Sequence, residues 1–231
     1  MTKLNRQGGT GRSPLLAEFL LIVAGVTVAL GADSLWSLRQ DRARESEYLE
    51  QLRADLTENR TRLVAAISDE ETLGAAALTA MKALASGTPI SADSARAWLV
   101  ERRGFNYSDP RLLTGTFSGL VESGDLRLIR DPDVRTAIIA YLPQITADRA
   151  EFDRWVDAFI EGVRAFRPVV LDLPEYYPRV GEAGVHALSA VPVHPLMGQV
   201  LDASVWTNEI RLIYLRRMLA ATEATRAAIG S

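Results

Sequence analysis

The residues best suited to carry chemistry lie together between Arg167 and Pro195. This stretch holds both histidines of the chain, two glutamates and a tyrosine pair, which are His186, His194, Glu175, Glu182, Tyr176 and Tyr177. A histidine side chain can ligate zinc or act as a general base near neutral pH. One hypothesis is therefore a metal-binding or hydrolytic domain that uses His186 and His194.

The spacing of the two histidines gives this hypothesis little support. His186 and His194 match no compact ligand motif such as H-E-x-x-H, and loop histidines beside prolines are more often structural. The stretch holds five of the ten prolines of the chain, which predicts a long irregular loop. Because such loops are often functional, Tyr176 and Tyr177 are candidate contacts for a protein partner.

Two further patterns resemble functional motifs but lack the required context. Gly115–Gly119 has the sequence G-T-F-S-G, which places Ser118 one position late for a nucleophile elbow and has no strand before it. The glycines of Gly8–Gly11 lack the strand, lysine and helix of a phosphate-binding loop. We therefore expect no catalytic residue and no cofactor site from these patterns.

The composition excludes two other classes of function. The formal net charge is −3, so no basic surface is expected to attract nucleic acid. The chain has no cysteine, which rules out disulfides and thiolate metal sites. A hydrophobic content of 48% is enough for an ordinary folded core, so the chain is expected to fold rather than remain disordered.

A long apolar segment near the N-terminus predicts a membrane-spanning helix. Leu15 to Leu38 comprises 24 residues, of which only Glu18 and Asp33 are charged. A helix of this length rises about 36 Å, which exceeds the roughly 30 Å of a bilayer's hydrocarbon core. Its apolar, small and interfacial positions include Leu15, Phe19, Ile22, Gly25, Ala29 and Trp36. The lipid bilayer is therefore the first expected partner, after a basic tail at residues 1–14.

A cleaved signal peptide is the alternative to an anchor. The uncharged run between Glu18 and Asp33 is only 14 residues long, and Ala29–Gly31 has the small-x-small form of a cleavage site. Trp36 and three following arginines favour the anchor, because interfacial residues flank membrane spans; these arginines are Arg39, Arg42 and Arg44. With three basic side chains on each side, the α-amino group tips the expected orientation towards a cytoplasmic N-terminus and an exported C-terminal domain.

Residues 39–86 predict a helical stem that continues the span, because no proline or glycine interrupts the chain before Gly74. One apolar edge of this stem consists of Leu49, Leu52, Leu56, Leu63 and Ile67. The edge predicts either a coiled coil, in which Asn59 sets the register of an oligomer, or an amphipathic helix packed on its own domain. Since small residues along the span also allow close helix contact, span and stem together predict a homo-oligomer.

Residues 87–231 predict a helical soluble domain. Asp109-Pro110 and Asp131-Pro132 each place an N-cap before a proline, which predicts a helix after each aspartate. Gly124 is expected to end the first of these helices. A last helix over 204–228 is expected to pack antiparallel on the second. The expected fold class is therefore all-α: a bundle-like domain with one long irregular loop.

Two stretches resemble an uncharacterised bacterial domain-of-unknown-function family of single-pass membrane proteins. The first is E-F-L-L-I-V-A-G-V-T-V-A-L at Glu18–Leu30, followed by Trp36 and by Glu47-Tyr48-Leu49; the second is S-G-D-L-R-L-I-R-D-P-D-V-R at Ser123–Arg135. Gly31–Ser34 departs from the amide-rich run of that family. Because the family has no established activity, the resemblance implies placement only: a bacterial inner-membrane protein, whose soluble domain the charge distribution predicts to be periplasmic.

The leading functional hypothesis is a non-enzymatic interaction, scaffold or sensory module on the membrane. It follows from the predicted anchor and stem and from the lack of a motif that carries chemistry. The metal-binding or hydrolytic domain at His186 and His194 remains the alternative hypothesis.

Overall fold

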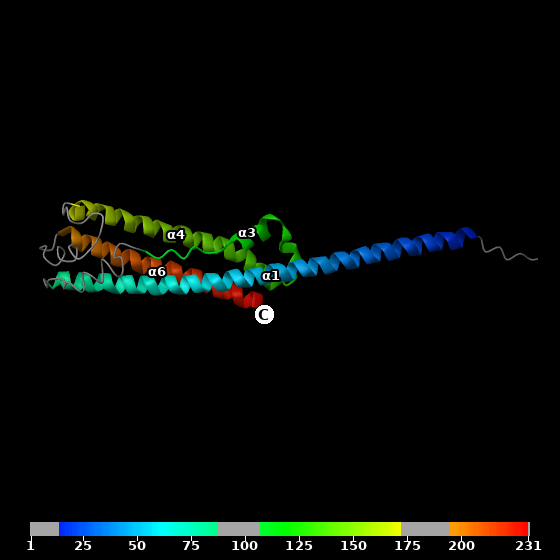
Figure 1. Ribbon diagram of the computed structural model, residues 1–231, viewed down its shortest axis with the longest axis horizontal. Coiled ribbons are helices and arrows are strands. Elements are labelled where there is room, and N and C mark those ends of the chain that lie inside the picture. The colour runs from blue at the N-terminus through cyan, green and yellow to red at the C-terminus, as the bar shows by residue number, and fades with distance from the viewer. Residues whose placement is uncertain (1–13, 87–106, 172–194, 231) are drawn as a thin grey trace, which may run out of the picture. The chain divides into compact units, whose positions relative to one another are not determined.

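The computed structural model describes residues 14–86, 107–171 and 195–230 of the 231-residue chain. These ranges form helices α1 (Pro14–Ala85), α3 (Gly115–Glu122), α4 (Pro132–Leu171) and α6 (Pro195–Gly230), with a short 3-10 helix η2 (Asp125–Leu128) (Figure 1). The described part of the chain contains no strand. The all-α prediction is therefore confirmed.

Helix α1 belongs to both of the units into which the chain divides, Met1–Glu47 and Tyr48–Ser231. In the first unit the described residues are all helical and belong to α1. The helix continues without interruption into the second unit, as expected of an apolar segment followed by a stem. No proline occurs after Pro14 in this helix, and residues with good helix propensity dominate the segment that follows the apolar one.

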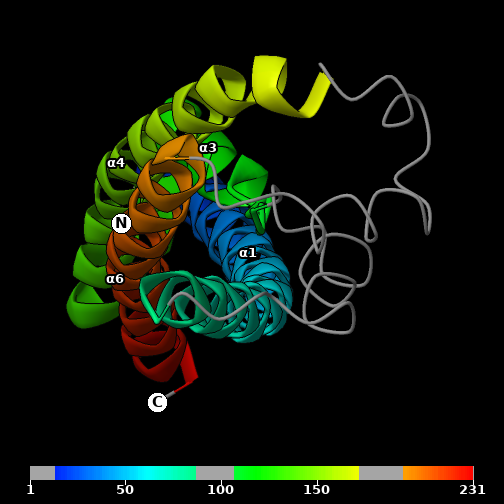
Figure 2. The ribbon, with the colours of Figure 1, turned by 90° about the vertical axis from the view of Figure 1, so that its left-hand side faces the viewer.

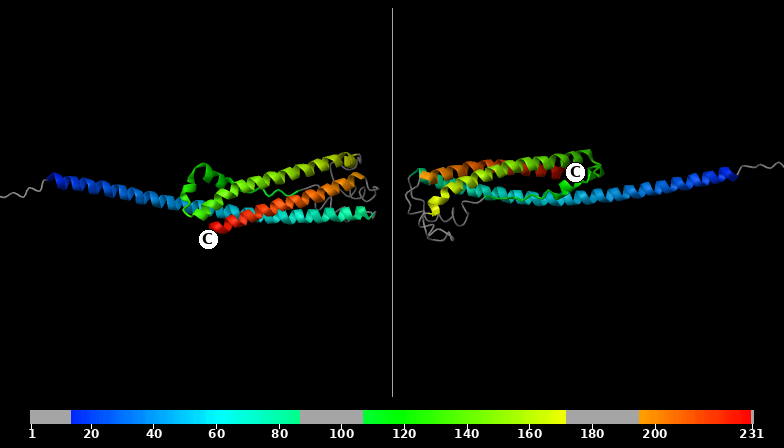
Figure 3. Two further views of the ribbon diagram at one scale, coloured as in Figure 1. Left: turned by 180° about the vertical axis from the view of Figure 1, so that it is seen from behind. Right: turned by 90° about the horizontal axis from the view of Figure 1, so that it is seen from above.

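The second unit is built on three long helical segments: α1 from Tyr48 onward, α4 and α6. Figures 2 and 3 show them side by side, with the end of α4 next to the beginning of α6, so these two helices are antiparallel as predicted. Apolar side chains three or four residues apart face the interior of the unit. The core includes Leu52, Leu56 and Leu63 of α1, Ile138, Ile145, Phe152 and Val156 of α4, and Leu215, Met218 and Ile229 of α6.

The apolar edge of the predicted stem thus packs within its own domain. Leu52, Leu56 and Leu63 are fully buried, and Leu49 and Ile67 pack against the same core. Of the two alternatives that the sequence left open, the described contacts correspond to the amphipathic helix on its own domain. The unit boundary at Tyr48 accordingly falls inside the predicted stem.

Two of the predicted helix boundaries agree with the structure. The carboxylate of Asp131 accepts hydrogen bonds from the backbone N–H groups of Asp133 and Val134 at 2.8 and 3.2 Å, which caps α4 at Pro132. Gly124 has φ of 74°, a left-handed conformation that glycine adopts without strain, directly after α3. These signals depend on residues adjacent in the sequence, so the sequence alone shows them clearly.

Three other predicted boundaries are wrong. The helix expected after Asp109 begins only at Gly115, because residues 107–114 are not helical and bind side chains of other segments instead. Residues 167–171 extend α4 into the predicted loop, and α6 begins at Pro195 rather than at residue 204. Proline at a first helical position needs no backbone N–H, which suits Pro195 to start α6.

Candidate functional site

The first candidate site is the apolar segment of α1. Its large apolar side chains from Phe19 to Leu38 are between 44% and 75% exposed. The candidate span residues Phe19, Ile22, Gly25, Ala29 and Trp36 are all exposed, and Leu15 is helical while its side chain lies outside the described residues. On soluble proteins, exposed apolar residues are usually scattered singly, whereas here they form a continuous surface along the helix. Among the described helices, α1 alone is long and apolar enough to cross a membrane.

The second candidate site is a buried ion pair in the second unit, between Glu70 of α1 and Arg211 of α6. Glu70 Oε2 lies 2.9 Å from Arg211 Nη2, and the two side chains are 0% and 2% exposed. The same oxygen accepts a hydrogen bond from Asn208 Nδ2 at 2.5 Å. The other oxygen, Oε1, accepts the backbone N–H of Ser108 at 2.8 Å. The carboxylate therefore joins α1, α6 and the segment 107–114.

The Arg211 guanidinium is enclosed by both polar and aromatic neighbours. Nη1 donates to Thr207 Oγ1 at 3.2 Å, and Cζ lies 4.9 Å from the ring centroid of Phe159 on α4. This position over an aromatic face is favourable for a cation. Arg211 Nε is buried and has no hydrogen-bond partner. Both oxygens of the Glu70 carboxylate thus have hydrogen-bond donors, whereas one N–H group of the Arg211 guanidinium has no acceptor.

The close approach of the Asn208 side chain to α1 depends on a glycine beside the ion pair. A Cβ atom added at Gly74 of α1 would collide with Oδ1 of Asn208. Asn208 also donates through Nδ2 to the backbone oxygen of Glu70 at 2.8 Å. Gly74 therefore allows the Asn208 amide to reach both the backbone oxygen and the carboxylate of Glu70.

A third polar group holds the segment 107–114 against α1. Asn59 donates through Nδ2 to Leu113 O at 2.8 Å, and Leu113 N donates to Asn59 Oδ1 at 2.7 Å. Nδ2 also lies 3.2 Å from the hydroxyl of Tyr141, which contacts Thr222 Oγ1 at the same distance. Burial raises the pKa of Tyr141, against an opposing effect of the hydrogen bonds with Thr222 and Asn59. Asn59 is fully buried, and its hydrogen bonds join α1 to Leu113 and Tyr141.

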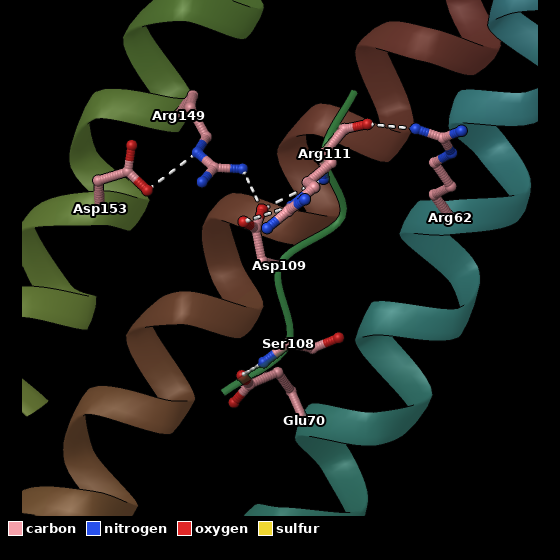
Figure 4. A network of polar contacts seen from close by, with 7 residues as sticks. All are labelled: Arg62, Glu70, Ser108, Asp109, Arg111, Arg149 and Asp153. Atoms are coloured by element: carbon pink, nitrogen blue, oxygen red, sulfur yellow. Dashed lines mark hydrogen bonds and ion pairs between the residues drawn. The ribbon is translucent and has the colours of Figure 1, made fainter. Parts of the chain in front are cut away.

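Charged side chains of α4 and α1 also bind the segment 107–114 (Figure 4). Asp109 lies 2.6 Å from Arg149 Nη1, while Arg149 Nε donates to Asp153 at 2.9 Å. Arg62 of α1 donates to the backbone oxygen of Arg111. Arg111 has φ of 37°, an uncommon conformation for a residue other than glycine, so these contacts hold the backbone against local strain.

The electrostatics of Asp109 favour its ionised form. Burial opposes ionisation, but hydrogen bonds from the Arg149 side chain and the Arg111 backbone outweigh it and lower the pKa of Asp109. Burial likewise opposes the charge of Arg149, yet Asp109 and Asp153 raise the pKa of its guanidinium. The Asp109 pair therefore stabilises the fold fully above the pKa of an unfolded aspartate, about 3.9. This contribution is lost as the pH falls through the lowered pKa of the folded state.

The residues predicted to carry chemistry cannot be placed relative to one another from the described ranges, and their prediction stays a prediction. His186, His194, Glu175, Glu182, Tyr176 and Tyr177 all lie outside the described residues. Within the ranges that are described, no group of three or more acidic or histidine side chains is arranged to hold a metal ion. Ser118 lies inside α3, in agreement with the helical interpretation of Gly115–Gly119.

The sequence analysis missed the buried ion pair. Glu70 and Arg211 are far apart in the chain, and a charged side chain is ordinarily expected on a solvent-exposed helix face. A signal was present in the apolar edge of α1, because Glu70 follows Leu63 and Ala66 at helical spacing on that edge. Continuing the periodicity would have placed Glu70 in the core.

Comparison with known proteins gives no further assignment, because no family model, curated protein or solved structure matches this chain.

Proposed function

We propose that this protein is a single-pass, membrane-anchored helical module that acts by interaction rather than by catalysis. In this proposal the apolar segment of α1 lies in a bacterial inner membrane, and the helical unit from Tyr48 onward is exported. The unit then serves as a scaffold or sensory domain for a protein partner. Resemblance to an uncharacterised family of single-pass proteins agrees with this placement and adds no activity.

One observation carries the proposal. Helix α1 provides both an exposed apolar segment and core residues of a folded helical unit. Leu21 and Ile22 are 75% and 57% exposed, and transfer of such apolar side chains from water to a nonpolar environment is favourable. A bilayer supplies that environment, and an unbroken helix satisfies its own backbone hydrogen bonds there. Among the described residues, no group of three or more histidine or acidic side chains could hold a metal ion.

The anchor is tested by a single arginine in the apolar segment. We expect Val26→Arg to move most of the full-length protein from the carbonate-resistant membrane fraction to the soluble fraction. Arginine at the centre of a span costs about 2.5–3.5 kcal/mol of insertion free energy. The measurement is immunoblotting of both fractions, with N-terminal sequencing of the wild-type protein to show that the segment is retained.

Val64→Arg is the matched control. Val64 is also on α1 and 43% exposed, but it lies in the helical unit, so this variant should stay in the membrane fraction. An active exported-enzyme reporter at the C-terminus is expected from the proposed orientation. Cleavage after the apolar segment, or wild-type protein that washes off in carbonate, would contradict the anchor.

We further propose that the membrane-anchored chains associate in pairs. The outer face of α1, defined as Ala54, Thr57, Thr61, Val64, Ala65 and Ser68, is exposed and uncharged. The hydroxyls of Thr57 and Thr61 donate to backbone oxygens of their own helix at 2.7 and 3.1 Å, so these polar groups already have hydrogen-bond partners. Identical anchors in one bilayer align two copies of α1 in parallel and raise their local concentration, which favours contact along this face.

Cysteine crosslinking in membranes tests this association, because the chain has no native cysteine. Thr61→Cys is expected to form a disulfide-linked dimer on mild oxidation. Thr146→Cys is the matched control, since Thr146 is likewise exposed and bonds its own helix on α4. Equal crosslinking of both variants, or none at Thr61, would show that the outer face of α1 is not a dimer contact.

A further inference from the structure

A surface hollow lies between α1 and the C-terminal end of α6 in the second unit. Its volume is about 540 Å³, and it is lined by Arg53, Thr57, Arg226, Ala227 and Gly230. The two lining arginines come from different helices, and no acidic residue is among the lining residues.

Arg53 is held in place without using all of its donors. Its Nε and Nη2 atoms donate to Ile229 O at 3.2 and 2.7 Å. The guanidinium carries further N–H groups beyond these two, and they remain available for a ligand. By covering the last turn of α6, Arg53 also reduces the negative end of that helix's dipole, which would otherwise repel an anion.

Arg226 is the less constrained of the two arginines. It makes no hydrogen bond or ion pair with any other residue in the ranges 14–86, 107–171 and 195–230. The acidic residue one turn earlier on α6, Glu223, is bound by Arg60 at 3.1 Å and is not a lining residue. The described lining residues therefore contribute two positive side chains and no negative one.

We propose that this hollow binds a phosphate group through Arg53 and Arg226. Guanidinium groups bind phosphate oxygens with paired hydrogen bonds, and two of them match the double charge of a phosphate. The group belongs either to a free phosphate compound or to the headgroup of an anionic phospholipid. This inference does not depend on the proposed association of two chains.

Binding of inorganic phosphate to the full-length protein tests the proposal. The protein is held in nanodiscs of phosphatidylcholine at constant ionic strength, and phosphate is titrated while the ³¹P resonance is followed. Saturable binding is expected, and Arg226→Gln should raise the Kd about tenfold, because one charge-assisted pair of hydrogen bonds is lost. Arg226 has no described partner, so this variant is expected to keep its fold.

Arg154→Gln is the matched control for the loss of one positive charge. Arg154 is 70% exposed on α4 and lies outside the hollow, so its variant should bind phosphate like the wild type. Absence of saturable binding, an unchanged Kd for Arg226→Gln, or equal weakening in both variants would each overturn the proposal.

A second arm distinguishes the two sources of the phosphate group. In nanodiscs that contain phosphatidylglycerol, a headgroup ligand should compete with added phosphate and raise its apparent Kd in the wild type but not in Arg226→Gln. An apparent Kd independent of phosphatidylglycerol assigns the site to a free phosphate compound. Either result is consistent with a phosphate site in the hollow, and the two results differ only in which compound supplies the phosphate group.

Discussion

Glu70→Ala is expected to lower the free energy of unfolding by about 3–5 kcal/mol, because it leaves the Arg211 guanidinium charged and unpaired in the interior. The carboxylate also accepts hydrogen bonds from Asn208 and from the backbone of Ser108, and these donors lose their acceptor. Urea unfolding of the full-length protein in neutral detergent, followed by circular dichroism, measures the effect.

The neighbouring glutamate supplies the control. Glu71 also pairs with an arginine of α6, Arg216, at 2.8 Å, but the two side chains are 52% and 59% exposed. Exposed pairs contribute at most about 1 kcal/mol, so Glu71→Ala should have little effect on unfolding. If both alanine variants lost similar stability, the buried environment of Glu70 would not be the cause.

A double variant separates the lost pair from the lost charge. Glu70→Leu with Arg211→Met removes both charges and replaces them with apolar side chains. Such replacements of buried pairs are often neutral or stabilising, so the double variant is expected to be more stable than Glu70→Ala. That result would mean that the ion pair mainly fixes the register of α1 and α6, which is how they align along their length, and adds little to stability. That register also depends on Gly74, whose missing side chain leaves space for Asn208.

The interior of α6 explains why this pair could not be predicted from periodicity alone. The last helix was expected to pack antiparallel on α4, and its interior positions near the pair are the polar residues Ser204, Thr207, Asn208 and Arg211. Apolar Ile213 is 53% exposed and Trp206 is 56% exposed on the same helix. Where polar side chains satisfy one another across helices, burial no longer follows hydrophobicity, and one helix's pattern cannot reveal its partner.

Elements governed by local interactions were predictable. The Asp131-Pro132 cap, the left-handed Gly124 and the apolar edge of α1 depend on neighbours within one or two helical turns, and all agree with the structure. The helix expected after Asp109 failed for the opposite reason. Its capping signal competes with contacts from Asn59 and Glu70, which lie far away in sequence and hold residues 107–114 in a non-helical conformation.

The candidate sites also differ in whether local sequence or contacts far apart in the chain determine them. An apolar segment is visible from composition, because a membrane span needs only length and hydropathy. Asn59 was also singled out by sequence, as a polar residue on an apolar edge, although its partner could not be identified. The structure places that partner in the same chain, since both backbone groups of Leu113 pair with the Asn59 amide. Hydrophobic periodicity can locate a buried polar residue without showing which segment it binds.

Asn59→Leu is expected to destabilise the helical unit by about 2–4 kcal/mol. Leucine fits an apolar interior, but it leaves the N–H and C=O of Leu113 without partners, and each such group costs about 1–3 kcal/mol. The contact between Asn59 and the Tyr141 hydroxyl is lost as well. Urea unfolding of the full-length protein measures the total effect.

Hydrogen exchange at single amides distinguishes this cause from general loss of packing. In the wild type the Leu113 N–H is bound by Asn59 Oδ1, so it should exchange slowly, whereas Asn59→Leu should accelerate it far more than the amides of α4. Thr57→Val is the control on the same helix, because the Thr57 side chain is exposed and bonds only its own backbone, and such changes usually stay within about 0.5 kcal/mol. Unchanged exchange at Leu113 would mean that the segment 107–114 is held mainly by Glu70, Arg62 and Arg149. Since those three contact other residues of the segment, the exchange rates of Ser108 and Leu113 together show which helix contact holds each end.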